Sequence, residues 1–245
     1  MERRWHHDVA AELSRVTIIF CIPGKEFSDR FLNSWTDTIT TFRERGAEAY
    51  LRTKYTSNVY LCRNQLLRHD NLAGQNQGDI KPFPNIAYDW LMWIDSDMVW
   101  EPSDVDKLIA KDKDIITGLA ITDPISSRLN FGACDGDGRI KFWHKKDLKD
   151  LPRSGDGLIE AGFAGFGFIL VKRGVFESMS FPWFKPTMIQ RGNEIYFPSE
   201  DITWSLRAVD LGWKIWADPE VCVGHEKPAV LRVPKDGERL TIGAV

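Results

Sequence analysis

The sequence lacks the features that mark several large classes of protein. Its four cysteines are widely separated and form no Cys-x-x-Cys pair, which excludes a zinc-finger type of site and a disulfide framework (Cys21, Cys62, Cys134 and Cys222). The longest strongly apolar run, Val16–Ile22, is far shorter than the roughly 20 residues of a membrane span. The first 15 residues contain no signal-peptide core. We therefore expect reduced, mostly buried thiols in a cytoplasmic protein without a transmembrane segment.

An excess of basic residues is also missing. Lys and Arg number 32 against 35 Asp and Glu, so the formal net charge is -3. Proteins that bind nucleic acids usually carry a clear basic excess, and we therefore expect no nucleic-acid partner. The hydrophobic fraction of 43% and charged fraction of 27% are typical of a globular protein and exclude a disordered or collagen-like chain.

Apolar runs and amphipathic stretches alternate through the first half of the chain. Val16–Ile22 is apolar without polar alternation, which predicts a strand buried on both faces of a parallel sheet. Further strands are predicted at 47–55, 90–94 and 114–121, and helices at 28–45, 59–69 and from Ser103, as its cap, to about 111. The second half predicts a hairpin at 131–143, a strand at 166–172, a helix at 199–211 and short strands at 214–217 and 221–223. The alternation predicts an α/β fold with parallel neighbouring strands.

The strongest candidate for chemistry is Asp95-Ser96-Asp97, which directly follows the predicted strand Trp90–Ile94. Ligands of open α/β sheets bind beyond the carboxyl ends of the strands, and two carboxylates spaced in this way can approach one Mg²⁺ or Mn²⁺ ion. A turn or a helix cap is the alternative interpretation. Another match to the same spacing, Asp135-Gly136-Asp137-Gly138, favours a tight hairpin turn.

Two later stretches and two tryptophans add further candidates. Glu200 and Asp201 follow Ser199 in the first turn of a predicted helix, where they complement the helix dipole or supply a general base. His225 follows a predicted strand and is either a hydrogen-bonded structural residue or a metal ligand. Trp183 and Trp204 are weaker candidates for contact with a sugar ring.

Taken in order, these motifs resemble a glycosyltransferase of the A-type (GT-A) fold, close to family 2 and to small viral and bacterial relatives. The resemblance covers about Val16 to Glu226; its landmarks are 16–24, Arg63-Asn64, 93–97, 161–173, 200–201, 210–216 and 224–225. It implies one GT-A-like α/β domain with a Rossmann-like, mostly parallel central sheet flanked by helices and a smaller antiparallel acceptor-side portion. The expected divisions are an N-terminal extension (1–15), a nucleotide-sugar half (16–125), an acceptor half (126–226) and a C-terminal tail (227–245).

The resemblance also implies an activity, which is transfer of a sugar from a nucleoside-diphosphate sugar to a hydroxyl of a glycan or small acceptor. UDP-sugars are favoured, with GDP- and dTDP-sugars open, and the transfer is expected to be inverting. It is expected to be non-processive, because the tryptophan motif of processive synthases is absent. The resemblance implies that Asp95, Asp97 and His225 bind Mn²⁺ or Mg²⁺. It implies that the nucleotide is bound by Pro23, Gly24, Arg63 and Ser96 together with the two aspartates. Asp201 is then the general base, and Glu200 orients the acceptor.

Two alternatives stay open. A sugar-1-phosphate nucleotidyltransferase should show an early, basic, glycine-rich loop, which Pro23-Gly24-Lys25 matches poorly. A non-catalytic nucleotide- or glycan-binding module of the same fold would not need the full set of Asp95, Asp97, Asp201 and His225.

Overall fold

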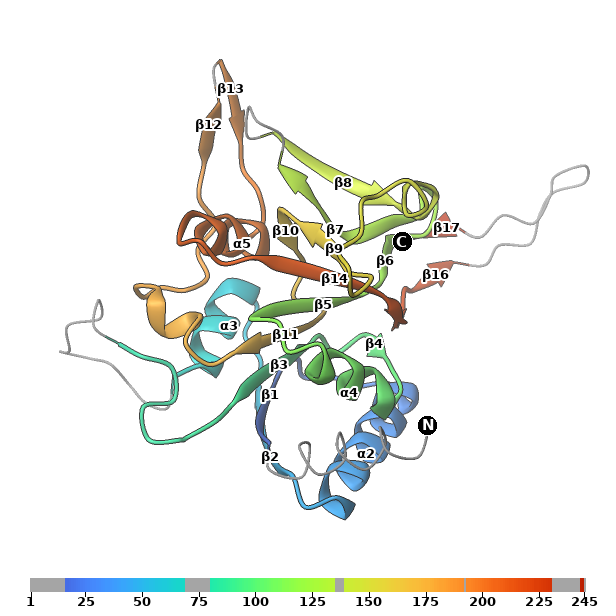
Figure 1. Ribbon diagram of the computed structural model, residues 1–245, viewed down its shortest axis with the longest axis vertical. Coiled ribbons are helices and arrows are strands. Elements are labelled where there is room, and N and C mark those ends of the chain that lie inside the picture. The colour runs from blue at the N-terminus through green and yellow to red at the C-terminus, as the bar shows by residue number, and fades with distance from the viewer. Residues whose placement is uncertain (1–15, 69–79, 135–138, 192, 231–242, 245) are drawn as a thin grey trace, which may run out of the picture.

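A seven-stranded sheet with the order β2-β1-β3-β11-β5-β14-β9 lies at the centre of the computed structural model, which describes residues 16–68, 80–134, 139–191, 193–230 and 243–244 (Figure 1). Strands β2, β1, β3, β5 and β14 run in one direction, whereas β11 and β9 run against them. The mostly parallel α/β sheet predicted from the sequence is therefore confirmed. Its strands are β1 (Thr17–Pro23), β2 (Glu48–Lys54), β3 (Trp90–Ile94), β5 (Ile115–Leu119), β9 (Ile159–Ala161), β11 (Phe168–Lys172) and β14 (Ile215–Cys222).

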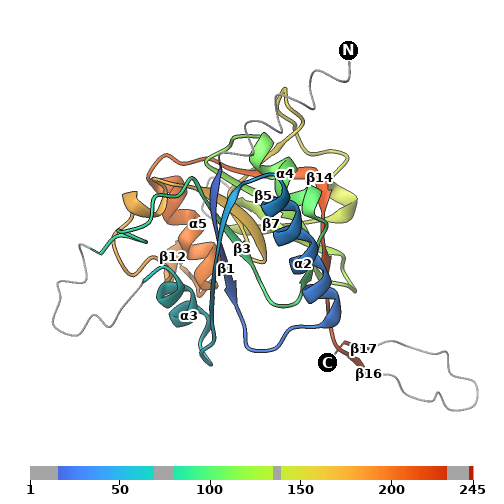
Figure 2. The same cartoon turned by 90° about the horizontal axis from the view of Figure 1, so that it is seen from below.

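Helices cover both faces of this sheet, as Figure 2 shows. Along β1, Ile18 and Phe20 pack with α2 and α4, whereas Ile19 and Cys21 pack on the opposite face with α3 and α5. Successive strand residues point to opposite faces, so a strand covered on both sides needs the unbroken apolar run that β1 has. The four α-helices of the described residues are α2 (Asp29–Glu44), α3 (Val59–Leu66), α4 (Pro102–Ala110) and α5 (Glu200–Asp210).

The second half of the chain adds smaller antiparallel sheets. Strands β10, β7 and β6 form one sheet to which β8 is added, and β7 with β8 matches the hairpin predicted at 131–143, whose turn at 135–138 lies outside the described residues. The β12–β13 hairpin projects from the body of the molecule above α5 (Figure 1). The remaining elements are β4 (Met98–Val99), β6 (Ile121–Asp123), β7 (Arg128–Cys134), β8 (Ile140–His144), β10 (Phe163–Ala164), β12 (Ile189–Arg191), β13 (Glu194–Tyr196), β15 (Gly224–His225), β16 (Ala229–Val230), β17 (Gly243–Ala244) and two 3-10 turns, Lys145–Asp147 and Phe176–Ser178.

Two local predictions were wrong. Helix α4 begins at Pro102 with Glu101 as its cap, so Ser103 lies inside the helix; proline is favoured at the first helical position because its φ is already helical. The two short strands predicted between 214 and 223 are one strand, β14, whose register against β5 shifts between Asp218 and Cys222. The shift coincides with an intervening proline, which cannot donate to the ladder.

None of the four cysteines forms a disulfide, but they are less uniformly buried than expected. Cys21 and Cys62 are buried, Cys134 is half-buried and Cys222 is exposed. Within the described ranges, each helix is too short or too polar to cross a bilayer.

Candidate functional site

A cavity of about 310 Å³ opens beyond the carboxyl ends of β1, β2 and β3. These three parallel strands are neighbours, so the loops that follow them meet at one edge of the sheet, where ligands of open α/β sheets bind. The cavity is lined by Pro23, Gly24, Tyr55, Thr56, Val59, Cys62, Asp95, Ser96 and Asp97.

The floor of the cavity depends on close contact between two loops. A Cβ atom added to Gly24 would lie 2.6 Å from the Cβ of Ser96, so the backbone after β1 can approach the Asp-Ser-Asp loop only because residue 24 is glycine. The Gly24 amide also donates to the Lys54 carbonyl (2.9 Å), which ties the end of β1 to the end of β2. Of the predicted nucleotide-binding residues, Pro23, Gly24 and Ser96 therefore lie at the cavity together with both aspartates.

Arg63 lies behind the cavity and joins two predicted carboxylates. Its Nη2 donates to both oxygens of Asp95 (2.9 and 3.0 Å), and its Nη1 donates to Oε1 of Glu200 (2.8 Å). The guanidinium is buried against the rings of Phe166 and Phe184. The sequence predicted that Arg63 would line the nucleotide pocket. It does not line this cavity and instead links the loop after β3 to the start of α5.

This burial shifts the protonation equilibria of the two carboxylates. Burial raises the pKa of Asp95, and Arg63 only partly offsets the effect. The pKa of Glu200 is raised for the same reason, with the same partial offset. Burial also acts against the charge of Arg63, but Asp95 and Glu200 outweigh it and raise the pKa of the guanidinium. Desolvation of ionised groups is unfavourable, so burying this cluster lowers the free energy of unfolding of the protein.

Asp97 faces a second group of side chains, contributed by the chain after β14. Its Oδ2 lies 3.0 Å from Nε2 of His225 and 3.4 Å from Nζ of Lys227, and the Lys227 ammonium lies 2.6 Å from the same Nε2. Burial alone would raise the pKa of Asp97, but His225 and Lys227 outweigh it and hold that pKa below its ordinary value. Lys227 was assigned to the C-terminal tail from the sequence, and its position two residues after His225 is the signal that could have found it.

The segment that carries His225 and Lys227 is fixed to the Asp-Ser-Asp loop by backbone bonds. Strand β15 pairs with β4, placing His225 opposite Met98. The amide of Glu226 donates to the carbonyl of Asp97 (2.7 Å), and the hydroxyl of Ser28, the cap of α2, donates to the Glu226 carboxylate. The structure therefore brings Asp97 and His225 together across 128 residues of sequence.

Asp201 lies at the amino end of α5, where the sequence predicted it. Its Oδ1 accepts hydrogen bonds from the Ser199 hydroxyl and from the amide of Ile202 (2.8 Å). A Cβ atom added to Gly165 would lie 3.5 Å from the other oxygen, Oδ2, so this oxygen faces the glycine-rich segment before β11. The charge of Asp201 also acts on Arg63 and Asp95, so the acidic pair and the Asp-Ser-Asp loop belong to one site.

The donor set fits a divalent cation that is shared with a substrate. The carboxylate oxygen of Asp97 and the imidazole nitrogen of His225 are both suitable ligands for Mn²⁺. Asp95 differs from the expectation, because both of its oxygens are bonded to Arg63. Across the described ranges no group of three His, Cys, Asp or Glu side chains could enclose an ion. Mg²⁺-like ions need only one or two protein carboxylates when water and substrate phosphates complete the shell.

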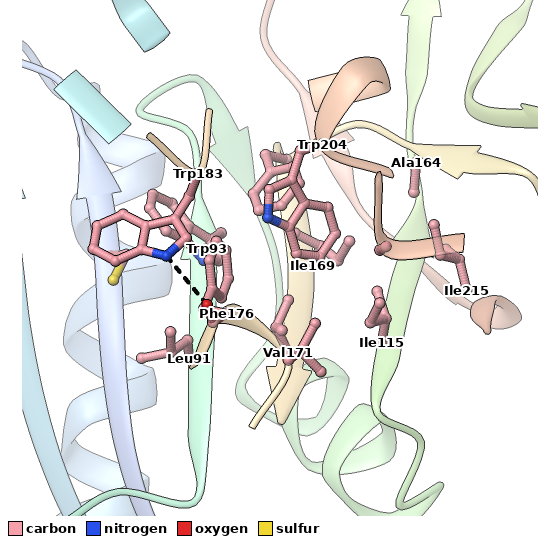
Figure 3. Packing of buried hydrophobic residues seen from close by; sticks show 14 of the residues in the cluster. Leu91, Trp93, Ile115, Ala164, Ile169, Val171, Phe176, Trp183, Trp204 and Ile215 are labelled. Carbon is pink, nitrogen blue, oxygen red and sulfur yellow. Dashed lines mark hydrogen bonds between the residues drawn. The ribbon is translucent and has the colours of Figure 1, made fainter. Parts of the chain in front are cut away.

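Trp183 and Trp204 do not reach a surface where a sugar could stack, and both predictions were wrong. Both side chains are completely buried, and Figure 3 shows them among Trp93, Phe176 and Ile169. The indole nitrogen of Trp183 donates to the carbonyl of Phe176 (3.1 Å). Large aromatic side chains dominate protein cores, which explains why two isolated tryptophans are weak signals for a sugar site.

A second cavity of about 320 Å³ shares no lining residue with the first and includes Glu160, Gly162, Trp213 and Lys214. Its single carboxylate is paired with Lys214 (3.1 Å), whereas the first cavity has two carboxylates from one loop and perturbed pKa values around it. Convergent titratable groups favour the first cavity as the functional site.

No protein-family model matches the sequence, and no curated protein sequence matches it. Among solved structures, the chain is similar to A197 from STIV, with 16% identity, coverage of 86% of each chain and a TM-score of 0.50. A mycobacterial protein shares 12% identity over 97% of this chain and 86% of its own, with a TM-score of 0.45. At 16% identity, the likeness to A197 concerns the fold alone.

Proposed function

We propose that the chain is a metal-dependent glycosyltransferase of the A-type fold. It transfers a sugar from a nucleoside-diphosphate sugar, most readily a UDP-sugar, to a hydroxyl of a glycan or small acceptor, with inversion and one transfer per encounter. The observation that carries the proposal is that Arg63 joins the loop after β3 to the first turn of α5. Asp95 and Asp97 follow β3, Glu200 and Asp201 are the first two residues of α5, and Arg63 bonds to Asp95 and to Glu200.

The cavity supports the nucleotide assignment by its position and its lining. It lies at the carboxyl ends of parallel strands and is bounded by the exposed ring of Tyr55, on which a base can stack. Tyr55 follows β2 directly, in the same way that Asp95 follows β3. The diphosphate then lies toward Asp97, where His225 and Lys227 also gather.

Asp201 is the proposed general base. In the transfer, the acceptor oxygen forms a bond to the anomeric carbon while the bond from that carbon to the β-phosphate oxygen breaks. The electron pair leaves with the nucleoside diphosphate, and the hydroxyl proton passes to Oδ2 of Asp201. The bonds from Ser199 and Ile202 to Oδ1 fix the carboxylate, and Oδ2 is the oxygen that we propose takes the proton.

Asp97 and His225 are the proposed cation ligands, and Asp95 acts through Arg63 to hold the loop in place. When bound, a divalent cation neutralises negative charge on the departing diphosphate. Glu200, which is buried against Arg63, positions the first turn of α5 and thereby Asp201.

The deciding experiment is a donor panel in which the protein is incubated with each nucleotide sugar and Mn²⁺, and released nucleotide is measured. Slow, Mn²⁺-dependent hydrolysis of one donor is the expected result. Binding without release across the whole panel would indicate a non-catalytic module. Pyrophosphate release from a nucleoside triphosphate and a sugar 1-phosphate would instead indicate a nucleotidyltransferase.

A further inference from the structure

The ammonium group of Lys227 lies against both Asp97 and His225. It lies 2.6 Å from Nε2 of His225 and 3.4 Å from Oδ2 of Asp97. The other ring nitrogen, Nδ1, lies 3.0 Å from the carbonyl oxygen of Ile121. Because a carbonyl only accepts, we assign a proton to Nδ1, and Nε2 is the ring nitrogen that faces both Asp97 and Lys227.

The three groups are in mutual contact. Nε2 of His225 and Oδ2 of Asp97 are 3.0 Å apart, and the Lys227 ammonium lies against both of them. A metal ion would need the same lone pair of Nε2, which cannot serve an ion and an ammonium at once.

The backbone at Lys227 is held in place, whereas the lysine side chain is partly exposed. Glu226 is bonded through its amide to Asp97 and through its carboxylate to Ser28, so the backbone on which Lys227 is carried is anchored. The Lys227 side chain is 37% exposed and has a long flexible stem. Its three donors can therefore move to new acceptors within reach while the backbone remains in place.

We propose that Lys227 is a diphosphate-binding residue, which holds the cation position in the free protein and turns onto the phosphate oxygens when nucleotide and metal bind. This inference rests on the proposed function, because it takes the diphosphate of a nucleotide as the ligand. It adds a residue to the site and predicts that removing this residue changes metal affinity and nucleotide affinity in opposite directions. The ammonium competes with the metal when nucleotide is absent and assists the nucleotide when metal is present.

The test uses Lys227→Met in the full chain, which removes the charge and keeps a flexible apolar stem. Calorimetric titration with Mn²⁺ alone should show severalfold tighter binding than in the wild type, because the competing ammonium is gone. Titration with UDP in saturating Mn²⁺ should show affinity reduced by roughly tenfold to a hundredfold, as expected for a lost charge-assisted hydrogen bond. Affinity for UMP, which lacks the β-phosphate, should fall much less.

Lys214→Met is the matched control, since Lys214 is an exposed lysine paired with Glu160 outside the site. It should leave both affinities unchanged, and Lys227→Arg should restore much of the UDP affinity. A merely structural role would lower both affinities of Lys227→Met together, along with its Tm, and would overturn the proposal. Unchanged UDP affinity in Lys227→Met, or a wild type that binds no diphosphate with Mn²⁺, would overturn it as well. These measurements need no turnover, so a donor panel without nucleotide release would refute the proposed enzyme while leaving the role of Lys227 standing.

Discussion

Replacing Arg63 with methionine tests the link between the two halves of the site. Breaking a buried ion pair by removing one partner costs about 3–5 kcal/mol, because the remaining charge is left desolvated. The substitution leaves two carboxylates without their Arg63 partner. The Asp95 side chain is 32% exposed at the cavity and can regain water, whereas the Glu200 side chain is only 9% exposed. We therefore expect the loss to come mainly from Glu200 and to lie near the lower bound, about 3 kcal/mol at neutral pH.

The pH dependence of this loss has a defined sign. The pKa values of Asp95 and Glu200 are already raised by burial, and removing Arg63 raises both further. A carboxylate whose folded pKa is raised contributes stability below its unfolded pKa and loses it as the pH rises through the folded value. The variant should therefore be most impaired at neutral pH, and the deficit should shrink by about 1.4 kcal/mol per pH unit for each carboxylate that becomes protonated.

The measurement is urea unfolding of wild type and variant at pH 7.5 and pH 5.5, followed by tryptophan fluorescence. Arg207→Met is the matched control, because Arg207 donates to the carbonyls of Ser180, Pro182 and Trp183 and has no carboxylate among these partners. Its deficit should be the same at both pH values. Adding Glu200→Gln to the Arg63 variant should recover most of the loss. A deficit below about 1 kcal/mol, or one independent of pH, would refute the reasoning.

Three further substitutions address binding and transfer. Asp97→Ala should abolish Mn²⁺-dependent binding of UDP in calorimetric titrations, whereas Asp137→Ala, in the motif Asp135-Gly136-Asp137, should leave it intact; equal losses would mean that Asp97 is not specifically required. Asp201→Asn should keep donor affinity and lower the transfer rate by roughly 10²–10⁴-fold, and an unchanged rate would remove Asp201 from the mechanism. Gly24→Ala should weaken UDP binding by at least about tenfold, because its Cβ would lie 2.6 Å from the Ser96 side chain. Gly155→Ala, with open space around it, is the control and should bind UDP like the wild type. Equal UDP affinities of the two variants would show that the close contact at Gly24 is dispensable.

The central sheet could be predicted because its strands carry their own signals. The runs that form β1 and β3 are apolar without alternation, which only a strand covered on both faces requires. The position of Asp95 and Asp97 then followed from a general rule about the carboxyl ends of parallel strands. The error at Ser103 arose because a proline at the first helical position competes with a good capping residue one position later.

The connections within the site could not be predicted in the same way, because they depend on contacts between distant parts of the chain. Arg63 and Glu200 are 137 residues apart, and neither local pattern indicates that one ion pair joins them. Lys227 reaches Asp97 only because β15 pairs with β4, and strands of two residues have no recognisable periodicity. Such contacts follow from the closed tertiary structure rather than from local propensity.

The charge balance of the site gives an independent argument for a divalent cation. Four carboxylates, those of Asp95, Asp97, Glu200 and Asp201, act on one another across the cluster, and two of them are directly bonded to Arg63. Arg63 and Lys227 supply two positive charges, so the cluster keeps a formal excess of two negative charges (four minus two) when all carboxylates are ionised. A nucleoside diphosphate bound here would add negative charge to this excess. Like charges repel strongly when they lie close together in a partly buried site. Under the proposed function, a divalent cation held by Asp97 and His225 would remove this excess and allow the acidic cluster to accept an anionic donor.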